Sequence, residues 1–182
     1  MKSLLTSIAA AVILVSSPIM AYADSPVEFA TKRHGELVAA ANSGDTTVAA
    51  KLIDRSIDWA DMMKASLGPN ASMLTRSETD DFRDMVHTLL TRSMTKSMKE
   101  LVGWQVVWHV SNDPIQQPQV KVSSIATKLD EQPVEVSYIL VPRKGEWVIA
   151  DMEIEGVSLA HSYQSQFNRV IKKEGVVGLL MK

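Results

Sequence analysis

The most regular hydrophobic pattern in the chain runs from residue 82 to residue 101. Apolar side chains recur there at spacings of three and four, with charged residues between them, as in an amphipathic α-helix. The apolar positions are Phe82, Met85, Val86, Leu89, Leu90, Met94, Met98 and Leu101. Thr75 and Glu78 precede this stripe in the form of a capping box, which satisfies two backbone N–H groups at a helix start. The pattern predicts one long helix that begins after Thr75 and ends near Gly103.

Shorter helices are predicted before this one. Residues 26–41 mix Ala, Val and Leu with Lys, Arg and Glu, and end near Asn42 and Gly44. Residues 46–56 and 57–67 read as two further helices, and Gly68-Pro69 stops the second. The first part of the chain is therefore predicted to be helical.

After Gly103 the hydrophobic period changes from near four to two. Alternating patterns predict strands at residues 104–110, 119–128, 134–140 and 146–155, joined by short connections. Four such strands predict an antiparallel meander, with Val148, Ala150, Met152 and Ile154 on one face against the helices. A final helix follows, capped by Ser158 and carrying Tyr163, Phe167, Val170 and Ile171. The predicted class is α+β: a four-stranded antiparallel sheet packed against a helical N-terminal half and a C-terminal helix.

The N-terminus has the pattern of a secretory signal peptide. Lys2 precedes an apolar run at residues 4–15, and Ala21-Tyr22-Ala23 supplies small residues for cleavage before Asp24. The run is shorter than the about 20 residues that a membrane span needs. We therefore expect residues 1–23 to be removed and the mature protein to be soluble, most simply in a bacterial periplasm.

Composition excludes several classes of function. The chain contains no cysteine, which excludes a lipoprotein anchor, a thiol nucleophile and a thiolate metal site. Its formal net charge is −2, so a general nucleic-acid role is not expected. The four histidines show no metal-binding spacing, and no phosphate-binding glycine motif occurs. We expect no metal and no cofactor.

The segment around Ser158 is close to the G-x-S-x-G turn of serine hydrolases. That turn requires an acid and then a histidine downstream, whereas the only later histidine, His161, precedes the only later acid, Glu174. An N-cap role for Ser158 needs no missing partner, so we predict a cap and no catalytic residue. A small serine hydrolase using Ser158 is retained as an alternative.

The same C-terminal region carries a family resemblance. The features are Val136-Ser137-Tyr138, Trp147 four residues before Asp151, "IEGVSL" at 154–159 and "SYQSQF" at 162–167. Upstream, "IDWADMMKASLG" at 57–68 and the capped helix at 74–94 add to the pattern. Together these resemble MlaC proteins, periplasmic phospholipid carriers also known as toluene-tolerance (Ttg) auxiliary proteins of ABC transporters. Hopanoid-associated periplasmic proteins share much of this pattern.

The resemblance implies a single lipid-binding domain at residues 24–182 with an apolar cavity between sheet and helices. It implies that the protein is no enzyme but carries phospholipid between an inner-membrane ABC transporter complex and an outer-membrane lipoprotein complex, which maintains outer-membrane lipid asymmetry. The expected lipid-binding residues come from both halves of the chain: Trp59, Met62, Met63, Phe82, Met85, Val86, Leu89, Leu90, Met94, Val136, Tyr138, Leu140, Val148, Met152 and Ile154, with Ala150 beside them. The alternatives are that these residues form an ordinary filled core, in a periplasmic interaction module without a ligand, or that the lipid is hopanoid-related.

Overall fold

The computed structural model describes residues 24–112 and 118–181 of the chain. The predicted signal peptide, residues 1–23, lies outside the described residues. The helices are α1 (Pro26–Ser43), α2 (Thr46–Ser56), α3 (Trp59–Leu67), η1 (Gly68–Met73), α4 (Arg76–Ser97), η2 (Met98–Leu101) and α5 (Leu159–Leu180).

The helix starts follow from side-chain caps. Ser25, Asp45 and Asp58 each accept a backbone N–H from the first turn of α1, α2 and α3, respectively. The predicted capping box before α4 is confirmed: the Thr75 N–H donates to Glu78 over 2.8 Å, and the Glu78 N–H donates to Thr75 Oγ1 over 3.3 Å. The long helix is therefore confirmed, although its last turn tightens into the 3₁₀-helix η2.

The strands form one antiparallel meander in chain order. They are β1 (Gln105–Val110), β2 (Val120–Thr127), β3 (Val134–Arg143), β4 (Glu146–Ile154) and β5 (Val157–Ser158). The prediction of four strands was wrong by one, because β5 folds back onto the end of β4. The turn residues Glu155 and Gly156 both have positive φ, 51° and 72°, as a tight two-residue hairpin turn requires. A strand of two residues is too short to leave an alternating pattern in the sequence.

A β-bulge in β4 corrects a second prediction. Asp151 pairs with Ile139 while Ile149 pairs with Leu140, so Ala150 is an extra residue in the ladder. Beyond the bulge Met152 pairs with Tyr138, whereas before it Val148 pairs with Val141. Because residues opposite one another share a face and Tyr138 and Val141 lie three apart, Val148 faces away from Met152. Val148, Ala150, Met152 and Ile154 therefore do not share one face.

The described residues contain two hydrophobic cores. The sheet core joins the start of α1 to one face of the sheet: Phe29, Ala30, Trp108, Val122, Tyr138, Leu140, Trp147 and Ile149. The helical core joins the helices to one another: Leu37, Ala40, Ala41, Ala49, Leu52, Ile53, Ile57, Met62, Leu67, Phe82, Val86, Leu90, Ala160, Phe167, Ile171 and Leu179. Helix α1 contributes to both.

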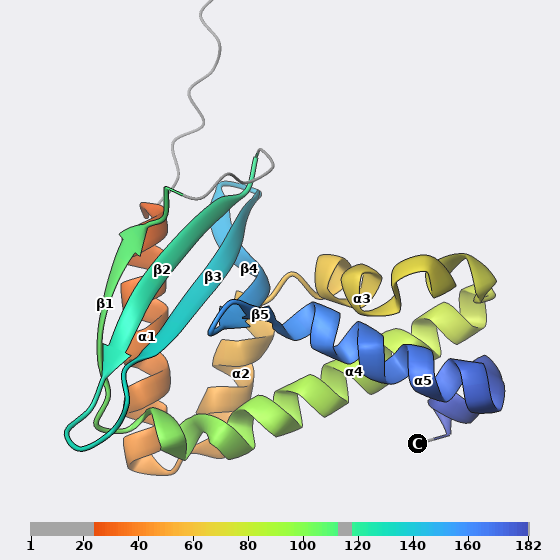
Figure 1. The fold of residues 1–182 in the computed structure, drawn as a ribbon, viewed down its shortest axis with the longest axis horizontal. Coiled ribbons are helices and arrows are strands. Elements are labelled where there is room, and N and C mark those ends of the chain that lie inside the picture. The colour runs from red at the N-terminus through yellow and green to blue at the C-terminus, as the bar shows by residue number, and fades with distance from the viewer. Residues whose placement is uncertain (1–23, 113–117, 182) are drawn as a thin grey trace, which may run out of the picture.

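The two cores lie side by side along the molecule. Figure 1 shows α1 covering one face of the sheet, while α3, α4 and α5 extend to one side and α4 runs back beneath the sheet. The segment between α2 and α3 joins the parts, because the Asp58 N–H donates to the Ile149 carbonyl over 2.8 Å. Arg143 strengthens this joint by pairing with Asp58 at 2.6 Å and with Asp61 at 2.8 Å.

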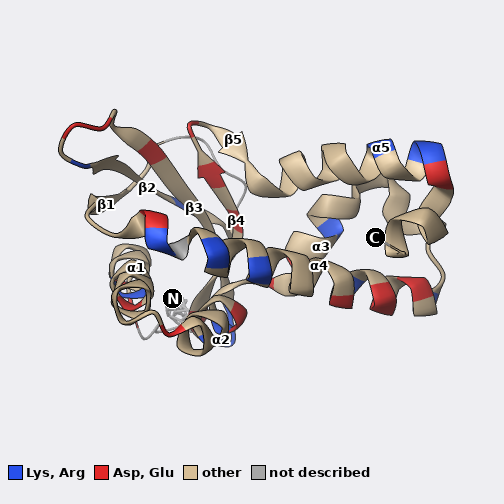
Figure 2. Ribbon diagram, turned by 90° about the horizontal axis from the view of Figure 1, so that it is seen from below, with Lys and Arg blue, Asp and Glu red and all other residues tan. Residues whose placement is uncertain are grey.

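Charge is unevenly distributed along α4. Its first half carries four acids, Glu78, Asp80, Asp81 and Asp84, beside Arg76 and Arg83, whereas its second half carries Arg92 and Lys96 and no acid. Figure 2 shows the acids toward one end of α4 in red and the bases toward the other in blue. Acids at the start and bases toward the end complement the helix dipole. The distribution therefore stabilises a helix that reaches beyond the sheet.

Candidate functional site

A cavity of about 320 Å³ lies where the sheet core and the helical core meet. Its lining is largely apolar and comes from most of the major elements: His34, Leu37, Ile53, Met94, Ser97, Glu100, Leu101, Trp104, Val106, Trp108, Ala126, Val134, Val136, Tyr138, Met152 and Ile154. Apolar concavities with few polar groups are the usual form of small-molecule and lipid sites.

The cavity has a buried floor and an exposed rim. Leu37, Ile53, Trp108, Ala126 and Tyr138 are buried and form the floor. Ser97, Glu100 and Ile154 also line the cavity but are exposed to solvent. The opening therefore lies between the end of α4 with η2 and the part of the sheet where β3 begins and β4 ends.

Strand register explains how the sheet supplies its side of the cavity. Val106 pairs with Ala126, Tyr138 with Met152, and Val136 with Ile154. Paired residues point to the same face, so these side chains form one continuous apolar surface across four strands. The bulge at Ala150 brings Met152 and Ile154 into this surface.

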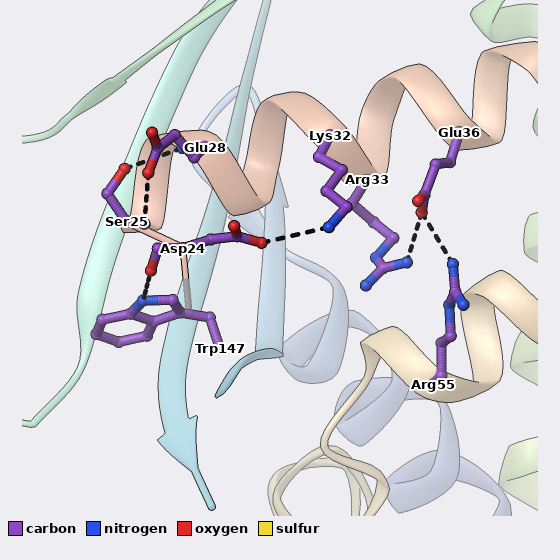
Figure 3. Close-up of polar contacts among 8 residues, drawn as sticks. All are labelled: Asp24, Ser25, Glu28, Lys32, Arg33, Glu36, Arg55 and Trp147. Carbon is purple, nitrogen blue, oxygen red and sulfur yellow. Dashed lines mark hydrogen bonds and ion pairs between the residues drawn. The ribbon is translucent and has the colours of Figure 1, made fainter. Parts of the chain in front are cut away.

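Helix α1 forms the opposite wall and is held at its start and near its middle (Figure 3). At its start, the Trp147 indole donates to the Asp24 carbonyl over 3.0 Å, next to the capping box of Ser25 and Glu28. Further along, Glu36 pairs with Arg33 at 2.6 Å and with Arg55 of α2 at 3.1 Å. These contacts fix the segment that carries His34 and Leu37.

Three rings meet at the floor of the cavity. Trp108 stacks on Tyr138 with centroids 4.5 Å apart, and His34 lies edge-on to Trp108 at 6.1 Å. Burial raises the pKa of the Tyr138 hydroxyl to about 12 and lowers the pKa of His34. Both rings are therefore neutral near pH 7, and the floor presents polar atoms without charge.

Five of the predicted residues line the cavity: Met94, Val136, Tyr138, Met152 and Ile154. The others lie elsewhere. Met62, Phe82, Val86 and Leu90 are buried in the helical core, with Trp59, Met63 and Met85 packed against it; Leu140 lies in the sheet core, Leu89 is 40% exposed, and Val148 faces away from the cavity side of β4. Contact of any of these residues with lipid remains a prediction.

Sequence reasoning missed much of the lining. The alternation of Trp104, Val106 and Trp108 is visible in the sequence and could have predicted that these side chains share the cavity face of the sheet with those of β3. By contrast, His34, Leu37 and Ile53 reach the cavity through tertiary packing, which leaves no local pattern.

Ser158 is an N-cap, as predicted. Its Oγ accepts the His161 N–H over 3.0 Å and donates to the carboxylate of Asp151 at Oδ2. Asp151 Oδ1 also accepts the Ala160 N–H over 3.0 Å. These groups border a larger polar groove of about 820 Å³, between α3, α5 and the opposite face of the sheet, in which Lys121 and Glu153 pair at 2.9 Å. The hydroxyl is thus fully used in holding the start of α5.

The described residues contain neither a metal-binding cluster nor a membrane-spanning helix. Across residues 24–112 and 118–181, no three His, Asp or Glu side chains gather as a metal ion would require. The described helices include no segment with the length and hydrophobicity of a membrane span.

Comparison with known proteins identifies a family and a similar solved structure. The sequence model of the family described as "MlaC protein" matches residues 32–182. Among solved structures, the chain is similar to the phospholipid-binding protein from Ralstonia solanacearum in complex with a phospholipid, with a TM-score of 0.73 and 21% identity over 87% of this chain and 94% of that one. At this identity the likeness establishes the fold. No curated protein matches the chain significantly.

Proposed function

The chain belongs to the MlaC family, and from this we propose that it binds phospholipid and carries it through the periplasm. The observation that carries the proposal is the apolar cavity between sheet and helices, which is open at one rim. The similar protein from Ralstonia solanacearum, which was solved with a phospholipid, supports the same ligand class.

The energetics of lipid transfer require such a cavity. Each buried CH₂ group is worth about 0.8 kcal/mol, so a 16-carbon chain represents roughly 12 kcal/mol of transfer free energy. A carrier must replace nearly all of this with apolar contact. A cavity of about 320 Å³ lies at the lower end of the roughly 300–1,000 Å³ range of ligand sites. A phospholipid with two chains is larger than most such ligands, so its binding requires the cavity to widen.

The cellular context belongs to the same proposal. Residues 1–23 act as a signal peptide, and residues 24–182 form a single lipid-binding domain in the periplasm. The partners are an inner-membrane ABC transporter complex and an outer-membrane lipoprotein complex. The protein acts as a carrier and not as an enzyme, which is supported by the capping role of Ser158.

To test the proposal, the full chain is expressed and the protein is purified from the periplasm. Native mass spectrometry then measures whether lipid is bound, and extraction identifies that lipid. We expect stoichiometric phospholipid. The test variant is Ala126→Phe, which fills the cavity floor. Its control is Ile125→Phe at the next position, because the Ile125 side chain is 52% exposed on the opposite face of the sheet.

Loss of lipid from Ala126→Phe alone, in a protein that still melts cooperatively, supports the cavity as the site. A lipid-free wild type that takes up nothing from liposomes contradicts the carrier proposal and favours an interaction module with a filled core. Hopanoid in the extract, in place of phospholipid, changes the ligand and keeps the site.

A further inference from the structure

The indole N–H of Trp108 is buried at the cavity floor without a partner. Trp108 is 6% exposed, and no described residue accepts a hydrogen bond from its Nε1. Two other indoles are paired: Trp59 donates to the Asp54 carbonyl and Trp147 to the Asp24 carbonyl, each over 3.0 Å. Of the described side chains with an unpaired buried polar atom, only Trp108 lines the cavity.

Such a donor calls for an explanation, because buried polar groups in proteins are nearly always paired. The neighbouring rings do not pair it, since Tyr138 stacks face to face and His34 lies edge-on at 6.1 Å. Trp108 lines the cavity but its Nε1 has almost no accessible surface, so a ligand would reach this donor as the cavity widens to admit it. A pure hydrocarbon chain would leave the donor unsatisfied, whereas an oxygen acceptor would satisfy it.

The surroundings select the kind of oxygen. The floor combines Leu37, Ile53 and Ala126 with uncharged rings, and none of the described Lys and Arg side chains lines the cavity. A phosphate oxygen there would lose its hydration without a compensating positive charge, which is costly. A carbonyl oxygen is neutral and accepts a single N–H at far lower desolvation cost.

We propose that Trp108 donates a hydrogen bond from Nε1 to an ester carbonyl oxygen of the bound lipid. The inference rests on the proposed function and deepens it, because it makes Trp108 a specificity-determining residue for acyl esters. The ester region of the lipid then lies against β1 and β3, and the headgroup extends toward the exposed rim at Ser97 and Glu100.

Two phospholipids with the same headgroup and chain length test this: a diacyl ester and a dialkyl ether, which lacks the carbonyl oxygens. Their affinities are compared by competition for the purified protein. A neutral hydrogen bond corresponds to an about two- to tenfold preference, which we expect for the ester in the wild type. Trp108→Phe keeps an aromatic ring, removes the donor and should abolish the preference. Trp104→Phe removes another indole from the cavity lining and should keep it.

Equal affinity of the wild type for ester and ether overturns the assignment, as does a preference that survives in Trp108→Phe. Binding of neither lipid instead overturns the proposed function, so the two failures are distinct. A measurement on the wild type covers the case that Trp108→Phe does not fold. In ¹⁵N-labelled protein the Trp108 indole resonance should move downfield with the ester and not with the ether. The Trp59 and Trp147 indoles, already paired, serve as internal references.

Discussion

Replacement of Ser158 by alanine separates a structural role from a catalytic one. The Ser158 hydroxyl accepts the His161 N–H over 3.0 Å and donates to Asp151 Oδ2. Asp151 Oδ1 in turn accepts the N–H groups of Met152 at 2.8 Å and Ala160 at 3.0 Å. The serine and the aspartate therefore jointly hold the junction between β4 and α5, and Ser158→Ala removes two bonds from it.

The expected loss of stability follows from these bonds. Loss of a serine N-cap costs about 1 kcal/mol. Loss of the hydroxyl bond to a carboxylate adds about 1 kcal/mol, at the low end for charged groups because Asp151 is only half-buried and keeps its backbone donors. The sum of about 2 kcal/mol lowers Tm by about 4–8 °C in a domain of this size.

Thermal unfolding of Ser158→Ala beside Ser158→Thr tests the reasoning, because threonine retains the hydroxyl. Ser158→Thr should stay near the wild-type Tm, and lipid content should be the same in all three proteins. If Ser158 were instead a catalytic nucleophile, Ser158→Ala would lose an esterase activity and keep its Tm. An unchanged Tm for Ser158→Ala would refute the capping argument, even if the wild-type protein shows no esterase activity.

Two further substitutions test the helical core and the cavity floor. Phe82 is fully buried and lies edge-to-face with Phe167 at 5.4 Å, so Phe82→Ala should cost about 3–5 kcal/mol in urea unfolding. Met85→Ala, at a half-buried neighbour, should cost clearly less, and equal losses would contradict the packing argument. Burial lowers the pKa of His34 below its ordinary 6.5, so the unfolded chain binds that proton first and stability falls as pH drops below 6.5. His34→Gln should remove this part of the pH dependence between pH 7 and 5, and parallel stability profiles would exclude it.

Local signals predicted the elements well. The capping box at Thr75, the stop at Gly68-Pro69 and the change of period after Gly103 each depend on a few adjacent residues, and the corresponding boundaries agree with the structure. The α+β class followed from the order of these elements. What local pattern could not give was the extra pairing of β5 and the bulge at Ala150, because both depend on backbone geometry at a turn or in a ladder.

The cavity was harder to predict for a physical reason. The apolar stripe of α4 looks like one surface in the sequence, yet most of it, including Phe82 and Leu90, packs against other helices, while Met94 reaches the cavity. The direction in which α4 crosses beneath the sheet decides which turns face which core (Figure 1). A hydrophobic period identifies a buried face and does not identify what that face is buried against.

The location of the cavity between two cores bears on how it can widen. Leu37 and Ile53 of its floor belong to the helical core, whereas Trp108 and Tyr138 belong to the sheet core. Separation of the two cores would enlarge the cavity, and it would require α1, which contributes to both cores, to give up its contacts with one of them. The contacts of Asp58 with Ile149 and Arg143 connect the segment before α3 to the sheet and would hold the two parts together during such a movement. A lipid carrier needs a site that can open and close, and in this fold the contacts of α1 with both cores would set how far the cavity opens.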